Sequence, residues 1–259
     1  MHRELEVAVE AARLAAAAIL DVYHRADHGT VEKADDKGPL TEADLASNAL
    51  IVDAIRTAFP DDGLLSEETV DSPHRLEKRR VWVIDPLDGT KEFTLRIPQF
   101  VVSIGLAIDG KAVLGVLLNP ATGELFTGVV GMGATYNGEP CTVTPRATLE
   151  GARLLVSATE HKKGWFDHLK GTATLEPMGS VAYKFGLVAA GLAEATFTPQ
   201  PRNEWDLLGG VACVLAAGGR ACDGSGADYV FNRPDPLHIG VCGDNGVLHE
   251  RVMELMKPR

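Results

Sequence analysis

Residues 81–90 read Val81-Trp82-Val83-Ile84-Asp85-Pro86-Leu87-Asp88-Gly89-Thr90, and they decide how the fold is interpreted. The first four residues are a continuous apolar run, which predicts a strand buried on both faces. Pro86 has no backbone N–H to donate, so we expect the hydrogen-bonded ladder to stop there. Asp85 then ends the strand and Asp88 follows in the next turn, so that one buried strand delivers two carboxylates to the same place.

Two carboxylates this close repel each other unless a cation lies between them. A divalent ion meets that need, and Mg²⁺ prefers hard oxygen ligands such as Asp85, Asp88 and the Leu87 carbonyl. Gly89 lets the backbone approach a ligand closely, and a helix that begins at Thr90 would offer free N–H groups to a phosphate. A metal-free alternative stays open on this string alone, namely an Asx-turn with Asp88 as a helix cap.

Three other segments place acids at the ends of expected elements. Glu67 and Glu68 follow a short apolar run, and Asp206 begins an expected helix. Asp44 lies three residues after Thr41, which is the spacing of a capping-box variant. Paired glutamates after a turn are usually solvated, and an acid at a helix start is often only a cap. Spacing alone therefore leaves both the structural and the functional interpretation open.

The wider pattern predicts two lobes in one compact unit. Residues 1–145 should form an α+β lobe that is rich in antiparallel strands and carries most of the acids. Residues 146–259 should form an α/β lobe that completes the site. Helices are expected at residues 4–23, 41–59, 181–190 and 206–217, and strands at 64–66, 81–84, 101–108, 112–118, 125–130 and 154–157. Hairpin signals stand at Asp109-Gly110, at residues 119–123 and at Asn137-Gly138.

The helix at residues 41–59 should bury one apolar face at helical spacing. That face is expected to hold Leu45, Ala49, Val52, Ile55 and Phe59. The polar, charge-rich residues 24–38 that precede this helix are interpreted as a mobile loop.

Composition excludes several classes of protein. The chain has 259 residues, 45% hydrophobic and 24% charged, which is typical of a globular protein with a large core. A formal net charge of −11 argues against a nucleic acid polymer as partner. No apolar stretch approaches the ~20 residues that span a membrane. Gly131-Met132-Gly133 is followed by Tyr136, where a dinucleotide-binding turn needs Gly or Ala.

The cysteines give no sign of a metal or disulfide framework. Cys141, Cys213, Cys222 and Cys242 contain no C-x-x-C pair, and no histidine stands at zinc-ligand spacing from them. We therefore expect free thiols in a reducing compartment, which places the protein in the cytoplasm.

Taken together, the acidic segments resemble the inositol monophosphatase-like superfamily of metal-dependent, lithium-sensitive phosphatases. The resemblance covers nearly the whole chain, in the family's order, and implies its layered α-β-α-β-α sugar-phosphatase fold. It is carried by residues 40–44 (Leu-Thr-Glu-Ala-Asp), 65–68 (Leu-Ser-Glu-Glu), 82–90, 205–210 (Trp-Asp-Leu-Leu-Gly-Gly) and 217–219 (Ala-Gly-Gly).

Within this superfamily the chain looks like the 3′(2′),5′-bisphosphate nucleotidase branch, which removes the 3′-phosphate from adenosine 3′,5′-bisphosphate. That likeness is carried by residues 33–41, by residues 85–93, and by Gly179-Ser180 followed by Lys184-Phe185. The branch often has Ser-Arg-Ser-His near the base site, whereas residues 156–161 here read Val-Ser-Ala-Thr-Glu-His, without the arginine. An inositol-1-phosphate or fructose-1,6-bisphosphate phosphatase therefore remains an alternative, and an inactive metal- or nucleotide-binding regulator is a more distant one.

The resemblance also implies roles for individual residues. Two or three Mg²⁺ ions would clamp the phosphate and lower the pKa of a bound water; their expected ligands are Glu67, Asp85, the Leu87 carbonyl, Asp88 and Asp206. Thr90, paired with Asp44, would orient and deprotonate that water, and Glu67 is also counted as catalytic. The expected substrate contacts are Leu87, Asp88, Gly89, Thr90, Ser180, Lys184 and Asp206. Further candidates are Thr41, Glu68, Lys91, Ser157, His161 and Arg202.

The second phosphate of a nucleoside bisphosphate needs cations, and Lys184 is the first choice. Lys162, Lys163 and Arg202 stand behind it, each with an ordinary interpretation as a solvated surface charge. The expected partner is a small phosphorylated substrate. Members of the family are often homodimers, but no interface pattern is visible in the sequence.

Overall fold

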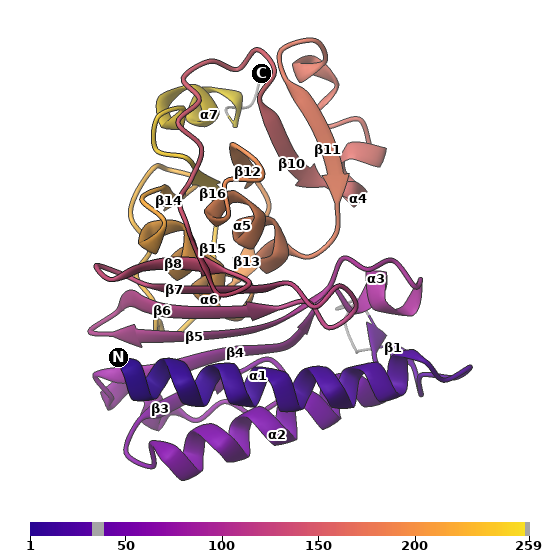
Figure 1. Cartoon of the computed structure of the whole chain (residues 1–259), viewed down its shortest axis with the longest axis vertical. Coiled ribbons are helices and arrows are strands. Elements are labelled where there is room, and N and C mark those ends of the chain that lie inside the picture. Colours follow the sequence, from indigo (N-terminus) through magenta and orange to yellow (C-terminus); the bar gives the residue numbers. More distant parts are fainter. Residues whose placement is uncertain (33–38, 257–259) are drawn as a thin grey trace.

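The computed structural model describes residues 1–32 and 39–256, which form alternating layers of helix and sheet (Figure 1). Helices α1 (His2–Tyr23) and α2 (Glu42–Ala58) cover one face of a seven-stranded sheet. Helices α5 (Val181–Ala189) and α6 (Glu204–Ala216) lie between that sheet and a five-stranded one. Helix α7 (His249–Leu255) packs on the far side. This is the expected α-β-α-β-α layering.

The first sheet is ordered β3-β4-β5-β6-β7-β8-β9, and only β3 and β4 pair in parallel. Its hairpins turn at Asp109-Gly110, at residues 119–123 and at Asn137-Gly138, as predicted. The strands are β3 (Gly63–Ser66), β4 (Arg80–Asp88), β5 (Val101–Ile108), β6 (Lys111–Leu118), β7 (Leu125–Val129), β8 (Gly133–Tyr136) and β9 (Glu139–Cys141).

The second sheet is ordered β11-β10-β12-β16-β14, with parallel pairs on both sides of β10 and antiparallel pairs on both sides of β16. Its strands are β10 (Arg153–Ser157), β11 (Thr174–Met178), β12 (Ala195–Thr198), β14 (Arg220–Asp223) and β16 (Val241–Asp244). Short pairs are formed by β1 (Val31–Glu32) with β2 (Pro39–Leu40), and by β13 (Arg202–Asn203) with β15 (Leu237–His238). The division into lobes near residue 145 stays a prediction.

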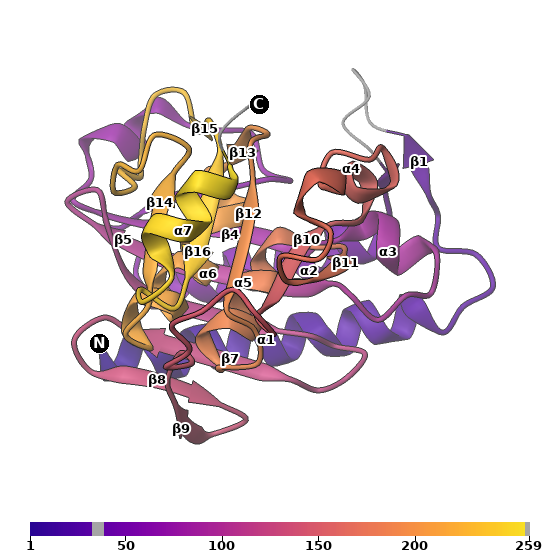
Figure 2. The ribbon, with the colours of Figure 1, turned by 90° about the horizontal axis from the view of Figure 1, so that it is seen from above.

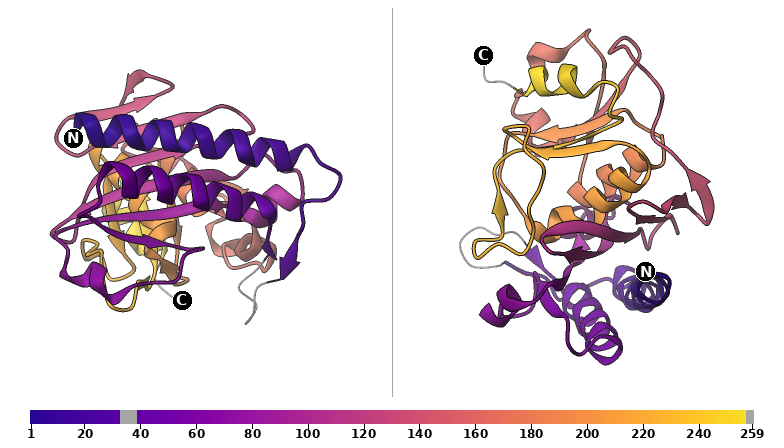
Figure 3. Two further views of the ribbon diagram at one scale, coloured as in Figure 1. Left: turned by 90° about the horizontal axis from the view of Figure 1, so that it is seen from below. Right: turned by 90° about the vertical axis from the view of Figure 1, so that its left-hand side faces the viewer.

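The helices owe their places to apolar faces that the sheets cover. Helix α1 buries Ala8, Ala12 and Ile19 in the core that it shares with the sheet and with α2, which lies beside it (Figure 3). Phe185 of α5 and Leu208 of α6 belong to a core that contacts both sheets. Other short helices are η2 (Pro73–Glu77), α3 (Thr90–Thr94), α4 (Ala158–Lys162) and η3 (Asp167–Leu169).

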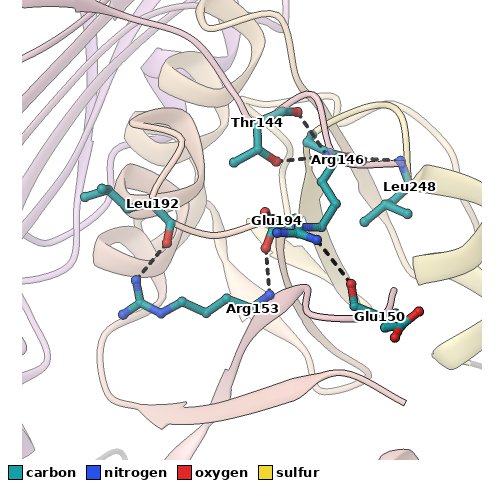
Figure 4. A network of polar contacts seen from close by, with 8 residues as sticks. Thr144, Arg146, Glu150, Arg153, Leu192, Glu194 and Leu248 are labelled. Carbon is teal, nitrogen blue, oxygen red and sulfur yellow. Dashed lines mark hydrogen bonds and ion pairs between the residues drawn. The ribbon is translucent and has the colours of Figure 1, made fainter. Parts of the chain in front are cut away.

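Buried polar groups fix the connection between the two sheets (Figure 4). The Asn245 amide donates to the backbone carbonyls of Thr144 and Arg146 at 3.1 and 2.9 Å. Glu194, only 6% exposed, accepts from Arg146 Nε at 3.3 Å and from the Arg153 backbone at 2.6 Å. The chain from β9 to β10 is therefore held against the second sheet.

Strand β4 does not end at Asp85, which corrects the expectation that Pro86 stops the ladder. Asp85 pairs with Ser103 and Asp88 with Val101, so β4 carries one residue more than β5 between these pairs. Such a β-bulge accommodates a proline, because the extra residue is left out of the ladder. The bulge turns the end of the strand and carries both acids with it.

The apolar face predicted for α2 is partly wrong. Leu45 is 50% exposed and Ala49 is exposed, whereas Val52 and Ile55 are buried as expected. The buried face instead includes polar residues, among them Asp44. Apolar spacing alone missed this face because the helix turns those polar groups towards the end of β4, where they find hydrogen-bond partners.

Helix α6 begins at Glu204 rather than Asp206. Residues 33–38, which belong to the expected loop and to the 33–41 likeness, lie outside the described residues. Within the described residues, no helix is both long and apolar enough to cross a membrane.

Candidate active site

Three carboxylates meet where the β4 bulge faces the start of α6. One oxygen from each of Asp85, Asp88 and Asp206 lies within 4.8 Å of the other two. Asp85 is 2% exposed and Asp88 9% exposed, while Asp206 is partly buried. The residues come from positions far apart in the chain, so only the packing of α6 on the sheet brings them together.

In each of these carboxylates, one oxygen accepts hydrogen bonds that fix the orientation of the side chain. Asp85 Oδ1 accepts from the Leu87 N–H at 2.9 Å, and Asp206 Oδ2 accepts from the Asn203 N–H at 3.1 Å. Asp88 Oδ2 accepts from Ser180 Oγ and from the backbone N–H of the second residue of α5, both at 2.6 Å. Residues of both halves of the chain therefore hold the cluster.

Burial makes this cluster costly when it carries its full negative charge. Burial raises the pKa of Asp85 well above its usual range, and the charges of Glu67, Asp88 and Asp206 raise it further. Burial followed by repulsion from Asp88 and Glu67 raises the pKa of Asp206 in the same way. Three hard oxygen donors that repel one another are relieved by a divalent cation, so the donor set fits a metal ion of that kind.

The expected ligand Glu67 stands at the edge of this group. It directly follows β3, and its N–H donates to the Ile84 carbonyl at 3.2 Å. The group within 4.8 Å does not include it, yet its charge raises the pKa of two members. Glu68 is partly buried and adds to the raised pKa of Asp44. Metal binding by either glutamate stays a prediction.

Asp44 joins the N-terminus of α2 to Thr90. Its Oδ2 accepts from the Thr41 N–H at 2.8 Å and from the Thr41 hydroxyl at 2.6 Å. Its Oδ1 accepts from the Thr90 hydroxyl at 3.0 Å, and Thr90 Oγ1 also lies 3.0 Å from the Leu87 carbonyl. Burial raises the pKa of Asp44, although these hydrogen bonds oppose the shift. The capping and the functional interpretations of this residue are therefore compatible.

Gly89 occupies a position that no other residue fits without strain. Its φ of +101° lies in the left-handed region, and a Cβ built on it would stand 2.7 Å from the Gln99 carbonyl oxygen. The glycine turns the chain from the bulge into α3, which begins at Thr90 as expected.

A pocket of about 380 Å³ opens beside the carboxylates. Glu67, Asp88 and Thr90 line it from the first sheet's side. Lys184, only 5% exposed, lines it from α5; its Nζ lies 3.3 and 3.4 Å from the carbonyls of Gly179 and Met178. Burial lowers the pKa of Lys184 to about 8, against the attraction of Asp88. The pocket therefore sets a carboxylate cluster beside a buried amine.

The sequence model of the inositol monophosphatase family matches residues 1–258. The chain belongs to the inositol monophosphatase family. Inositol monophosphatase 3 of Solanum lycopersicum is 34% identical over 236 residues, covering 87% of each chain. The 3′(2′),5′-bisphosphate nucleotidase CysQ of Escherichia coli (strain K12) is 36% identical over 231 residues, covering 86% of this chain and 91% of CysQ. The IMPase of Thermotoga maritima superposes with a TM-score of 0.87 at 28% identity, covering 97% of this chain and 96% of the other.

Membership of this family makes the protein a metal-dependent phosphatase that acts on small phosphorylated substrates. The pocket beside the carboxylates is also lined by several of the other residues expected near the site: Gly89, Lys91, Ser157, Ser180 and Arg202. Lys91 is exposed. Arg202 Nη2 lies 3.5 Å from Glu160 Oε1, and Ser157 Oγ accepts from the Glu160 N–H at 3.3 Å.

The remaining expected cations do not reach the pocket. Lys162 and Lys163 are exposed, and Lys163 Nζ stands 5.7 Å from the centre of the Trp165 ring. Neither lines the pocket, and nor does His161, whose buried Nδ1 has no hydrogen-bond partner among the described residues. Contact of Lys162, Lys163 or His161 with the substrate stays a prediction.

Sequence reasoning missed several residues that shape the site. Ser47 Oγ donates to the Pro86 carbonyl at 2.8 Å and so holds the bulge. Gln99 Oε1 accepts from the Gly179 N–H at 3.0 Å. Glu92 lines the pocket, and burial raises its pKa. Ser47 had one available signal, because it lies three residues after Asp44 and so shares its helical face.

Proposed function

We propose that this phosphatase is a Mg²⁺-dependent 3′(2′),5′-bisphosphate nucleotidase. It would hydrolyse adenosine 3′,5′-bisphosphate to AMP and inorganic phosphate. The observation that supports this choice is the buried Lys184 in the pocket wall, with Arg202 lining the same pocket. A substrate with two phosphates needs one place for the reacting phosphate and a separate cationic place for the other.

Lys184 has the properties of an anion-binding group. A buried ammonium is unfavourable unless it is paired, and its two carbonyl contacts at 3.3 and 3.4 Å are long for hydrogen bonds. The lowered pKa of Lys184 has the same cause, because burial removes water from the ammonium and the nearby acids do not fully replace it. A phosphate bound beside it would restore the charged form, so substrate charge and lysine charge would stabilise each other.

The reacting phosphate is placed at the carboxylate cluster. Asp85, Asp88 and Asp206 would hold the metal, with Glu67 and the Leu87 carbonyl as further donors, for two or three ions in all. Bound Mg²⁺ neutralises charge on the phosphate and makes water a better nucleophile. The backbone of Gly89 and Thr90 would hold the phosphate oxygens.

Thr90 and Asp44 would handle the proton of the attacking water. The Thr90 hydroxyl can donate to Asp44 Oδ1 at 3.0 Å while its lone pairs accept from the water. Asp44 is buried and its pKa is raised, which makes its carboxylate a stronger base than an exposed aspartate. The proton then has a short path from water through Thr90 to Asp44.

A phosphate-release panel tests the substrate assignment. It compares kcat/KM for adenosine 3′,5′-bisphosphate, inositol 1-phosphate and fructose 1,6-bisphosphate at saturating Mg²⁺. We expect the highest value for adenosine 3′,5′-bisphosphate. A preference for inositol 1-phosphate or fructose 1,6-bisphosphate would overturn the proposal and leave the alternative activity, inositol or sugar phosphate hydrolysis, in its place.

The Lys184→Met variant tests the supporting observation, because methionine keeps the apolar stem and removes the charge. We expect KM for adenosine 3′,5′-bisphosphate to rise roughly 10-fold or more, the size of a lost charge-assisted hydrogen bond. KM for inositol 1-phosphate should change much less. Lys163→Met is the matched control, since Lys163 is exposed and does not line the pocket. Equal effects on both substrates would remove Lys184 from second-phosphate binding.

Lithium sensitivity belongs to the same proposal. Millimolar Li⁺ should inhibit phosphate release at subsaturating Mg²⁺, because a small monovalent cation can occupy a carboxylate site without supplying a divalent charge. Full activity under those conditions would point to a different arrangement of cations.

We also propose a cytoplasmic location, which the free thiols of all four cysteines support, and a homodimer, which sedimentation would test.

A further inference from the structure

A second cluster of metal-binding side chains lies outside the phosphatase pocket. One ligand atom from each of Cys222, Cys242 and His249 lies within 4.8 Å of the other two. Both cysteines are 0% exposed and His249 is 5% exposed. They come from β14, β16 and α7, which lie together in Figure 2, and none of them lines the pocket beside Asp88.

Strand register brings the two thiols together. Cys222 and Cys242 are direct partners in the antiparallel pair β14–β16, so their side chains project from the same face of the sheet. Helix α7 begins at His249 and packs Val252 onto that face. The residues do not have the short spacings of common zinc motifs, because pairing through space rather than along the chain creates the group.

Two further side chains support a ligand role for this group. Asp244 is 0% exposed, and its Oδ2 lies 2.7 Å from His249 Nδ1 and 3.3 Å from Cys242 Sγ. A carboxylate that holds a histidine ring in this way is a regular feature of protein metal sites. Met253 Sδ lies 3.6 Å from Cys222 Sγ and adds a soft donor.

We propose that Cys222, Cys242 and His249 bind a thiophilic d¹⁰ metal ion, Zn²⁺ or Cu⁺, at a structural site distinct from the carboxylate site. Two sulfurs and an imidazole select soft or borderline metals, whereas Mg²⁺ prefers oxygen ligands. Asp244 orients His249. The ion would tie α7 to β14 and β16, and so would stabilise the end of the chain.

A path for the ion exists. His249 and Met253 line a separate pocket of about 370 Å³, together with Arg220 and Glu250. An ion that enters there meets the imidazole first and the buried thiols behind it. Binding would displace the thiol protons, because the thiolate is the metal-binding form.

The test uses the full-length protein, reduced and stripped of metal, in saturating Mg²⁺ to occupy the carboxylate site. Co²⁺ is added as a spectroscopic probe, and Zn²⁺ and Cu⁺ are then titrated in separate arms. We expect a thiolate-to-cobalt charge-transfer band at one ion per chain, loss of the band when Zn²⁺ or Cu⁺ displaces Co²⁺, and a higher Tm with the bound ion. Displacement by only one of the two ions would support the site and identify its metal.

Variants locate the site. The double variant Cys222→Ser/Cys242→Ser should lose the band, and Asp244→Asn should weaken binding by about 10- to 100-fold. Cys141→Ser is the matched control and should keep the full band, because Cys141 is a partly exposed cysteine of the other sheet. If the double variant fails to fold, the band of the wild-type protein and its weakening in Asp244→Asn still decide the question.

Three results would overturn the proposal. The first is the absence of a thiolate band, with no shift in Tm in either the Zn²⁺ or the Cu⁺ arm. The second is an unchanged band in the folded double variant. The third is a reduced protein that takes up neither ion while mild oxidation joins Cys222 to Cys242 in a disulfide. Phosphate release by the double variant should equal that of the wild type, since neither cysteine belongs to the catalytic pocket.

Discussion

At Asp44, one carboxylate oxygen serves the fold and the other faces Thr90, the threonine proposed to orient the attacking water. The Oδ2 atom accepts two bonds from Thr41 at the start of α2, and Oδ1 accepts from Thr90. The helix cap therefore fixes the orientation of the carboxylate that is proposed to act as the base. Because the cap and the proposed proton acceptor are the same rigid group, the acceptor would be preorganised before any substrate arrives.

Thr90→Ala removes the hydroxyl that is proposed to orient water. We expect kcat to fall roughly 100-fold, the size of a lost acid–base relay, with a much smaller change in KM. Steady-state kinetics at saturating Mg²⁺ would measure both. Thr90→Ser is the matched control and should recover most of kcat, because it restores the hydroxyl 3.0 Å from Asp44. An unchanged kcat in Thr90→Ala would exclude Thr90 from handling the proton.

Asp206→Asn should separate activity from stability. The amide oxygen can still accept from the Asn203 N–H, but the residue no longer adds a negative charge beside Asp85 and Asp88. We expect kcat to fall roughly 100-fold or more, since even outer partners of metal ligands are worth 10- to 100-fold. The Tm in EDTA should stay equal to that of the wild type or rise. Wild-type turnover at saturating Mg²⁺ would refute the metal assignment.

At the scale of elements, close packing of α6 on the first sheet positions Asp206. A Cβ built on Gly115 of β6 would stand 2.0 Å from the Gly209 carbonyl oxygen of α6. Gly128 on β7 also lies close to the helix, with Cys213 Cα at 2.7 Å from its built Cβ. Glycines on the sheet therefore let the helix backbone approach, and the approach carries Asp206 to the end of β4.

Gly115→Ala should push α6 away from the sheet and displace Asp206. We expect a loss of about 1–3 kcal/mol in the free energy of unfolding, which is typical of overpacking, together with weaker Mg²⁺ activation. Denaturant unfolding and the Mg²⁺ concentration for half-maximal activity would measure the two effects. Gly186→Ala is the control, because the atoms nearest its new Cβ belong to side chains and lie at 3.1 Å, which is a milder contact than the one at Gly115. A Gly115→Ala protein with wild-type Mg²⁺ dependence would contradict this account of α6.

For the whole molecule, the carboxylate cluster links stability to pH and metal. The folded pKa values of Asp85 and Asp206 lie well above the ordinary aspartate value of about 3.9. The metal-free folded state therefore holds protons that the unfolded state releases. The contribution of these two groups to the free energy of unfolding is fully present below the unfolded pKa and is lost as pH rises through the folded values.

We expect the Tm in EDTA to fall as pH rises from about 4 towards neutrality, because the cluster's contribution to stability is lost over that range. Mg²⁺ binds the ionised cluster, so the Tm difference between Mg²⁺ and EDTA should grow with pH. Differential scanning calorimetry over that range, with and without Mg²⁺, would measure it. In Asp206→Asn both trends should weaken. A Tm difference that does not depend on pH would show that the cluster is not the dominant Mg²⁺ site.

The site was only partly readable from the sequence, for reasons visible at single residues. Each acid had a sufficient local explanation: Asp44 caps α2, Asp88 is the last residue of a strand, and Asp206 lies in the first turn of α6. Only the resemblance to a family indicated that these acids belong to one site, because hydrophobic periodicity carries no information about contacts between distant segments. Glu92 and Gln99 went unnoticed because nothing local marks a side chain that reaches a pocket across the fold.

By itself, the sequence determined the long helices α1, α2, α5 and α6 and the strands β3 to β7 of the first sheet. Apolar runs and turn residues placed β5 at residues 101–108 and set the hairpins around it, because strand and turn preferences act over a few neighbouring residues. Only the tertiary structure decided the β4 bulge at Pro86, the polar buried face of α2, and the meeting of Asp206 with Asp85 and Asp88. These depend on packing between segments distant in the chain, where the cost of burying charge, and not local preference, selects the arrangement.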